Sequence, residues 1–160
     1  MNGWGFLQTM INLDVLDHVR RAKYARRLLK QGIVWVDTFR NPTFKTFIID
    51  LVRKDQLKAK GIDSEGSVIG YYSQTTARRD SRKPFNTHYT LDDTGDFYRS
   101  MFLFVTIDFF EIKADFAKMQ DQEWWSEKIL GLTDESLEKI RDAYKEKLQN
   151  YARELLLGRS

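Results

Sequence analysis

Apolar positions in the last third of the chain recur at the spacing of an amphipathic α-helix. They follow one another at intervals of three or four residues: Leu137, Ile140, Tyr144, Leu148, Tyr151 and Leu155. Leu132 and Leu137 lie on either side of Thr133 as the two halves of a hydrophobic staple around a helix cap, and acidic residues follow where the helix dipole favours them. We therefore expect a long carboxy-terminal helix over residues 133–157.

The same spacing near the other end of the chain predicts a basic amphipathic helix. Its apolar positions are Leu13, Leu16, Val19, Tyr24 and Leu28. Much of the rest is basic: Arg20, Arg21, Lys23, Arg26, Arg27 and Lys30. Residues 1–10 have no basic segment ahead of an apolar core, so they do not fit a signal peptide, and we expect a short arm with an aromatic anchor there.

A further helix is expected after Asn41, because an Asn cap followed by proline at the first helical position is a typical helix start. Its apolar side chains are Phe44, Phe47, Ile48 and Leu51, and it runs to about Lys54. Residues 33–39 fit either a short strand or a continuation of the preceding helix, and the pattern leaves both open.

The stretch 61–87 is rich in Gly, Ser, Thr and charge, which predicts a long loop. Within it Ser73 is placed to cap a short helical turn over residues 74–80. A second basic cluster follows: Arg78, Arg79, Arg82 and Lys83. Long loops of this kind often bind partners.

Two strands are expected after this loop. Residues 97–105 have apolar side chains on both alternating faces, and residues 110–116 alternate apolar with charged side chains. Trp124 and Trp125 are expected to lock a short helix onto the sheet. The fold class is therefore α+β, a single domain over residues 1–160 in which a small antiparallel sheet packs against amino-terminal helices and the long carboxy-terminal amphipathic helix.

Composition narrows the chemistry. The 160 residues include no cysteine, which excludes disulfides and thiolate sites, and only two histidines, His18 and His88, neither in a metal-ligand motif. No apolar run is long enough to span a membrane. Residues 1–60 carry 12 Lys and Arg against 5 Asp and Glu, whereas residues 61–160 carry 14 against 18. This polarity suits head-to-tail packing between copies or a surface that faces nucleic acid.

The tripeptide Asp93-Thr94-Gly95 is the one with which retroviral-type aspartic proteases present a catalytic carboxylate. Such enzymes share one proton between two aspartates, supplied here by a homodimer. Asp92 and Asp96 flank the tripeptide, and their charges would disturb that proton or attract a divalent cation. The simpler interpretation is a turn in which Gly95 takes a positive φ and a strand leaves directly after it. We favour the turn, and we expect no catalytic residue, metal ion or cofactor.

Three stretches in the second half resemble tailed-phage virion morphogenesis proteins, the tail-completion and neck proteins of Mu-like and related phages. The first is residues 72–79, a Ser/Thr-rich stretch that ends in two arginines. The second is residues 91–100, which contain the structural turn formed by Asp93, Thr94, Gly95, Phe97 and Ser100 and look similar to a form found in Bacteroides-group phages. The third is residues 129–135, a Leu-Gly-Leu lead into the last helix. The resemblance covers about residues 70–150.

The resemblance implies a non-enzymatic virion protein that assembles in the host cytoplasm as a ring at the head-tail connector or neck, or in tail completion. Its implied partners are other copies of itself, neighbouring neck, portal or tail proteins and, through nonspecific contacts, packaged DNA, with no membrane. The candidate contacts with DNA or a neighbouring subunit are Arg20, Arg21, Arg26, Arg27, Arg78, Arg79, Arg82 and Lys83. The alternatives are a nucleic-acid-binding module that uses the basic amino-terminal helix and, less favoured, the aspartic protease.

Overall fold

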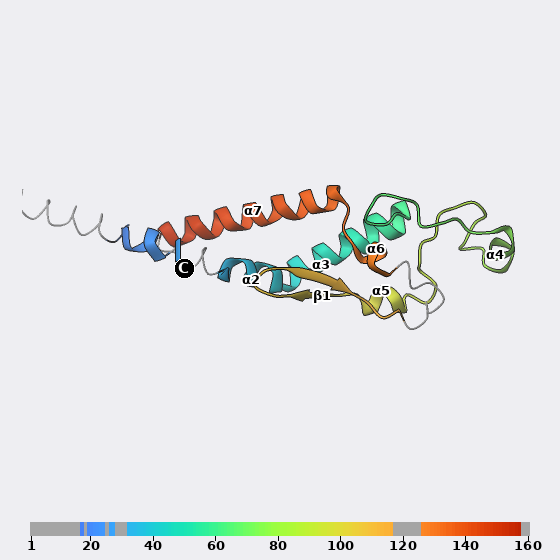
Figure 1. Ribbon diagram of the computed structural model, residues 1–160, viewed down its shortest axis with the longest axis horizontal. Coiled ribbons are helices and arrows are strands. Elements are labelled where there is room, and N and C mark those ends of the chain that lie inside the picture. Colours follow the sequence, from blue (N-terminus) through green and yellow to red (C-terminus); the bar gives the residue numbers. More distant parts are fainter. Residues whose placement is uncertain (1–16, 18, 25, 28–31, 117–125, 158–160) are drawn as a thin grey trace, which may run out of the picture.

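A computed structural model describes residues 17, 19–24, 26–27, 32–116 and 126–157. The fold is α+β: helices occupy both ends of this range, and one antiparallel hairpin lies between them. Figure 1 shows an elongated molecule in which α7 (Asp134–Leu157) runs along one side of the helices α2 and α3, and the hairpin lies along the other.

Three helical segments follow one another in the amino-terminal half. They are α2 (Ile33–Arg40), α3 (Pro42–Asp50) and the wider π-type turns of η1 (Leu51–Lys60). Asn41 separates the first two, and its side chain accepts hydrogen bonds from the backbone N–H groups of Thr43 (3.0 Å) and Phe44 (3.3 Å). The helix start expected at Asn41 is confirmed. The helical alternative for residues 33–39 is the correct one.

The helix η1 ends at Gly61, whose φ of 60° lies in the left-handed region. A Cβ at this position would lie 2.3 Å from the His88 ring, so only glycine fits between the end of η1 and the chain that returns beside it.

The hairpin consists of β1 (Phe102–Val105) and β2 (Phe110–Lys113), paired so that Leu103 lies opposite Ile112. Leu103, Val105 and Ile112 are buried and belong to the same core cluster as side chains of α2, α3 and η1. The neighbours of these residues along each strand point away from that core and are exposed. The strand expected at residues 97–105 therefore begins later than predicted.

Residues 96–100 form the short helix α5 (Asp96–Ser100) instead of the start of a strand. A helical turn points Phe97 and Tyr98 into the core together, whereas a strand would send them to opposite faces. The apolar pattern of residues 97–105 therefore has two causes. Phe97 and Tyr98 are buried in a helical turn, and β1 has exposed aromatic side chains on its outward face.

The helix α7 begins at its expected cap, since Thr133 Oγ1 accepts a hydrogen bond from the Ser136 backbone N–H at 3.3 Å. Ile140 is buried, and Tyr144 lies edge-on against Trp35 of α2 with ring centroids 5.6 Å apart. Leu137 was expected on the buried face and is instead 40% exposed. Ser136 takes the buried place in this turn because its hydroxyl has partners there.

Residues 70–90, the finger, project beyond the end of η1 and carry α4 (Gln74–Arg79) at their tip (Figure 1). Both arms of the finger pair through their backbones: the Tyr72 N–H donates to Thr87 O at 2.9 Å and the Tyr89 N–H to Gly70 O at 2.9 Å. The predicted Ser73 cap is present, with its hydroxyl accepting from the Thr76 N–H at 3.2 Å. The predicted loop 61–87 is therefore mostly a narrow, ordered projection.

The described residues of the basic amino-terminal helix are helical, as expected. Val19 and Tyr24, which the pattern placed on its apolar face, are both exposed. The arm at residues 1–10 and the Trp124-Trp125 pair lie outside the described residues.

Candidate functional site

The turn at residues 92–100, the corner, is held by its own side chains. Gly95 has a φ of 76° and precedes α5. The Thr94 hydroxyl donates to Asp96 Oδ2 at 2.6 Å, and the Arg99 guanidinium pairs with Asp96 and donates to Thr94 O at 3.0 Å. These residues face one another across the turn, so their side chains serve the corner itself.

Two further corner residues connect it to the core and to β2. Phe97 is buried, with ring centroids 5.7 Å from Tyr98 and 5.3 Å from Phe116. The Ser100 hydroxyl donates to Phe97 O at 2.7 Å and accepts from the Asp115 N–H at 2.9 Å. Ser100 therefore ends α5 and extends the ladder of the hairpin by one bond.

Asp93 differs from the rest of the corner, because 71% of its side chain is exposed. The Lys83 ammonium lies 2.7 Å from its carboxylate, and this hydrogen bond holds the pKa of Asp93 below its ordinary value. Arg82 pairs with Asp80 at 2.8 Å, which lowers the pKa of the Asp80 carboxyl to about 2. Arg82 also lies 3.8 Å from the Asp93 carboxylate, so both Arg82 and Lys83 join the finger to the corner.

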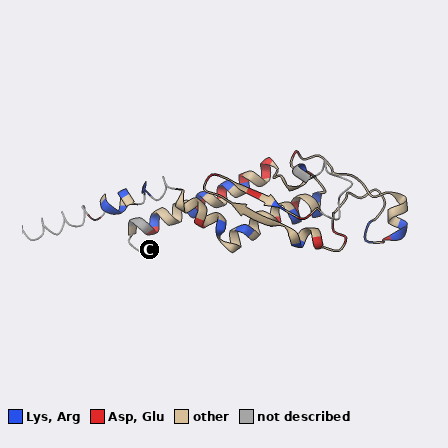
Figure 2. Ribbon diagram, turned by 60° about the horizontal axis from the view of Figure 1, so that its bottom comes forward, with Lys and Arg blue, Asp and Glu red and all other residues tan. Residues whose placement is uncertain are grey.

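The other two arginines of the finger have different surroundings. Arg78 and Arg79 are exposed in the last turn of α4, and no carboxylate pairs with either in the part of the chain that the structure describes. Figure 2 shows this basic tip at one extreme of the molecule. In the second predicted basic cluster, Arg82 and Lys83 therefore form ion pairs, whereas Arg78 and Arg79 form none with the described residues.

The basic residues near the amino terminus lie at the opposite extreme from α4 (Figures 1 and 2). Arg20, Arg26 and Arg27 are exposed, while Arg21 pairs with Asp17 at 2.6 Å. The structure therefore does not bring the two predicted basic clusters together.

The hairpin carries a site that the sequence reasoning missed. Its outward face and turn expose large apolar side chains: Phe102 (52%), Phe104 (44%), Ile107 (58%) and Phe109 (51%). The Lys113 ammonium lies over the Phe104 ring, 5.0 Å from its centroid, and the Phe104 and Phe109 rings are 6.4 Å apart. The signal in the sequence was the run of apolar residues on both faces of the predicted strand.

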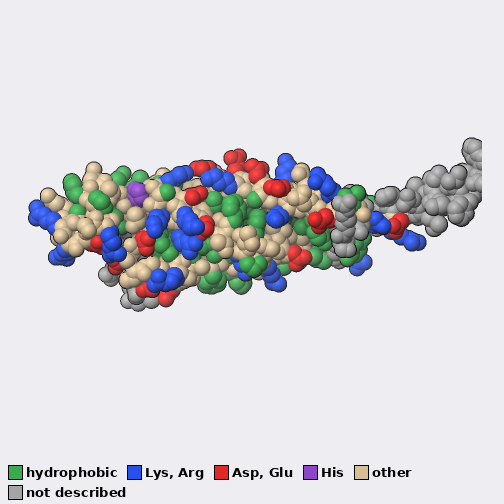
Figure 3. Space-filling view, turned by 180° about the vertical axis from the view of Figure 1, so that it is seen from behind, with side chains coloured by type: hydrophobic (Ala, Val, Ile, Leu, Met, Phe, Trp, Pro, Cys, Tyr) green, Lys and Arg blue, Asp and Glu red, His purple; other side chains and the backbone are tan. Residues whose placement is uncertain are grey.

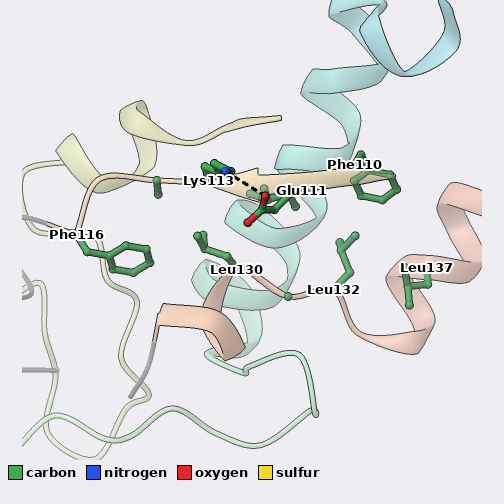
Figure 4. Close-up of a pocket in the computed structure, with 10 residues that line it drawn as sticks. Phe110, Glu111, Lys113, Phe116, Leu130, Leu132 and Leu137 are labelled. Atoms are coloured by element: carbon green, nitrogen blue, oxygen red, sulfur yellow. Dashed lines mark ion pairs between the residues drawn. The ribbon is translucent and has the colours of Figure 1, made fainter. Parts of the chain in front are cut away.

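Beside this face, an open groove of about 710 Å³ follows the outer edge of β2 (Figure 4). One wall consists of β2 from Phe110 to Lys113 and of Ala114, the residue after it. The facing wall carries Leu130, Leu132 and Leu137, which come from the end of α6 (Ser126–Leu130), the link to α7 and the first turn of α7. Because consecutive strand residues point to opposite faces, a groove that touches five in a row must run along the edge.

Other kinds of site have less support in the described ranges. No group of three or more His, Asp or Glu side chains there is arranged to hold a metal ion, and His88 instead lies 3.2 Å from the backbone carbonyl of Lys58. Among the same residues, no helix combines the length and apolar character needed to cross a bilayer.

Comparisons with known proteins found no matching family model, no matching curated protein and no matching solved structure. The corner, the basic finger tip and the hairpin with its groove are therefore interpreted from their own geometry.

Proposed function

We propose that this protein is a non-enzymatic structural subunit of a tailed-phage virion, one that forms a ring at the head-tail connector or neck, or in tail completion. The phage assignment rests on the resemblance of residues 70–150, in which the corner, the hairpin and the lead into the last helix follow in order. Its partners are other copies of itself and the neighbouring neck, portal or tail proteins, and it is assembled in the host cytoplasm.

The observation that carries the assembly role is the exposed aromatic face of the hairpin. Phe102, Phe104 and Phe109 lie close together on a chain that is otherwise rich in charge, and each exposes about half of its surface. Clustered aromatic side chains on a polar surface mark a site of protein contact, because covering them releases ordered water. A contact with a different surface of the next copy is heterologous and closes a ring when the rotation between copies permits.

The geometry of Asp93 also favours a structural role over the protease. A catalytic pair of aspartates shares a proton, which requires one carboxyl with a raised pKa. The pKa of Asp93 is instead lowered by Lys83, which lies within hydrogen-bond distance of the carboxylate. The corner uses Thr94 and Gly95 for its own turn.

Negative-stain imaging and mass photometry of the purified protein test this proposal. We expect a defined ring-shaped oligomer that the pair of substitutions Phe104→Ser and Phe109→Ser disrupts, since both side chains are largely exposed in the single chain. Phe85→Ser is the matched control, because Phe85 is 62% exposed on the finger, away from the hairpin. Monomers alone at high concentration, or equal effects of the hairpin and control substitutions, would contradict the proposal.

The second candidate function, nucleic-acid binding, is favoured by the free arginines of the α4 tip and by the exposed arginines near the amino terminus. Nonspecific contacts of this kind with packaged DNA are also compatible with a ring around it. DNA affinity should then fall steeply as the salt concentration rises.

Charge reversal separates the two basic regions. One variant changes Arg78 and Arg79 to Glu; a second carries Glu at all four positions of the helix, namely Arg20, Arg21, Arg26 and Arg27. Reversal of Lys145 and Lys147, exposed on α7, changes the charge by the same amount as the first variant and is the control for it. If the two basic-region variants bind DNA as well as the control does, the nucleic-acid hypothesis is wrong.

A further inference from the structure

The outer edge of β2 carries backbone groups that have no partner among the residues that the structure describes. The Thr106 N–H donates to Phe109 O at 2.9 Å, so Thr106 and Phe109 are a hydrogen-bonded pair of the hairpin. Hydrogen-bonded and non-bonded pairs alternate along an antiparallel hairpin, so the N–H and C=O groups of Phe110 and Ile112 point away from β1. No backbone bond to either residue from that side is present among the residues that the structure describes.

Such an edge is a template for another strand, because an added strand satisfies the free groups at once. The groove described above lies along this edge, with the leucine wall on its far side (Figure 4). Leu137, unusually exposed for its position on α7, forms part of that wall. The edge and the apolar wall together favour an extended segment over a compact ligand.

The sequence of β2 indicates which segment fits. With Ala114, the residue after it, the sequence is Phe-Glu-Ile-Lys-Ala. Two copies of this segment in antiparallel orientation have complementary side chains at the paired positions. If two copies pair antiparallel about Ile112, each Phe110 lies opposite the partner's small Ala114. Each Glu111 then lies opposite the Lys113 of the other copy, while the two Ile112 residues face each other.

The backbone groups that point outward from β2 are also placed to hydrogen-bond in this register. Ala114 follows the end of β2, and its backbone groups point outward if the alternation continues by one residue. The outward-pointing groups of Phe110, Ile112 and Ala114 then meet as hydrogen-bonded pairs. Glu111 and Lys113 form the non-bonded pairs, whose side chains approach most closely. Opposite charges at directly paired positions stabilise a sheet, and like charges destabilise it. Centring the pair on Glu111 instead would place two carboxylates face to face.

We infer that two copies of this chain associate through their β2 edges, about a two-fold axis at Ile112, and form one continuous four-stranded antiparallel sheet. The contact is isologous, so each residue of the edge is used twice. It does not rest on the proposed function, since a two-fold pair uses a different surface from the head-to-tail contact that closes a ring. The two contacts are compatible in one assembly, because the aromatic face and the β2 edge are separate surfaces of the hairpin.

Sedimentation measurements on two charge variants test this inference. Glu111→Lys alone places two lysines opposite each other at both symmetry-related positions, and Lys113→Glu alone does the same with two glutamates. Each variant should associate with itself at least tenfold more weakly than the wild type does. Glu111 and Lys113 also pair with each other within one chain at 3.1 Å, and each variant removes this ion pair. Because both side chains are exposed, its loss should leave the fold unaffected, which circular dichroism checks.

Association of a mixture of the two variants is the most specific test of the register. In a mixed pair every position 111 again faces an opposite charge at position 113, so the mixture should recover association that neither variant has alone. A contact that did not join positions 111 and 113 of different copies would show no such recovery. Glu146→Lys and Lys145→Glu, with the same charge changes on exposed positions of α7, are the controls and should leave association unchanged.

The failures are distinguishable. A wild-type protein that is monomeric at high concentration, or single variants that associate normally, would overturn the edge pairing. A ring that forms normally from either single variant, with no two-fold pair in the wild type, would overturn the edge pairing and leave the proposed function standing. A two-fold pair that forms without any ring would support the edge pairing and contradict the proposed function.

Discussion

Gln56 is the polar side chain on which the junction between η1 and α7 depends. It is 2% exposed, and it makes three hydrogen bonds. Its Nε2 donates to Gly131 O at 3.0 Å, and its Oε1 accepts from the Thr133 N–H at 3.1 Å and from the Ser136 hydroxyl at 3.0 Å. These partners lie in the link that carries the leucine wall of the groove and in the first turn of α7.

Replacing Gln56 with Leu keeps most of the buried volume and removes all three bonds. Each polar partner left buried without a bond costs roughly 1–3 kcal/mol. Gly131 and Thr133 are only half-buried, so water compensates part of their loss, and we expect a total of about 3 kcal/mol. For a chain of this size that corresponds to a Tm about 6–12 °C lower.

Urea unfolding followed by circular dichroism measures this loss as a change in the free energy of unfolding. Gln149→Leu, an exposed position on α7, is the control and should stay within about 0.5 kcal/mol of the wild type. A loss below about 1 kcal/mol for Gln56→Leu would refute the reasoning, because the junction would then not depend on these bonds.

Three further predictions concern other parts of the fold. Gly95→Val should cost about 2–3 kcal/mol in urea unfolding, because a β-branched residue is strained at a positive φ, whereas Asp93→Asn removes only an exposed ion pair and should cost less than about 1 kcal/mol; equal costs would contradict the structural role of the turn. Asn41→Ala should lower the free energy of unfolding by about 1 kcal/mol through loss of the α3 cap, and no change in a thermal melt would count against that cap. Hydrogen bonds from Lys60 and Lys139 lower the pKa of Glu135 from 4.5 to about 2, so its stabilising effect should be complete above pH 4.5 and disappear as the pH falls toward 2; melts of wild type and Glu135→Gln that differ equally at pH 6 and pH 2 would be inconsistent with this linkage.

Local signals in the sequence predicted the helices well. The cap at Asn41, the cap at Ser73 and the start of α7 after Thr133 all depend on side chains that bond to nearby backbone groups, and all three are confirmed. These bonds join residues two or three positions apart, so the sequence alone contains the whole interaction.

Features that depend on distant residues were harder to predict. The burial of Phe97 and Tyr98 together depends on a core assembled from α3 and η1, and it converts a predicted strand into α5. Leu137 is exposed because Gln56, far away in the sequence, gives Ser136 the buried place. Neither contact has a local periodicity.

The candidate site shows the same division. The corner at residues 92–100 was predicted as a structural turn, and its side chains do bond across it. The division of the basic finger into Arg82 and Lys83, tied to Asp93, and a free α4 tip required the fold. Figure 3 shows how charged side chains of both signs are interspersed over the face opposite to that of Figure 1, which composition could not reveal.

Quantitative mass spectrometry of purified phage particles tests the central claim most directly. The particles must come from the phage or induced prophage that carries this sequence. If the protein is a ring-forming neck or tail-completion subunit, its peptides will be present in mature virions at a fixed number of copies per particle. Virions that are infectious and contain none of this chain would contradict the account.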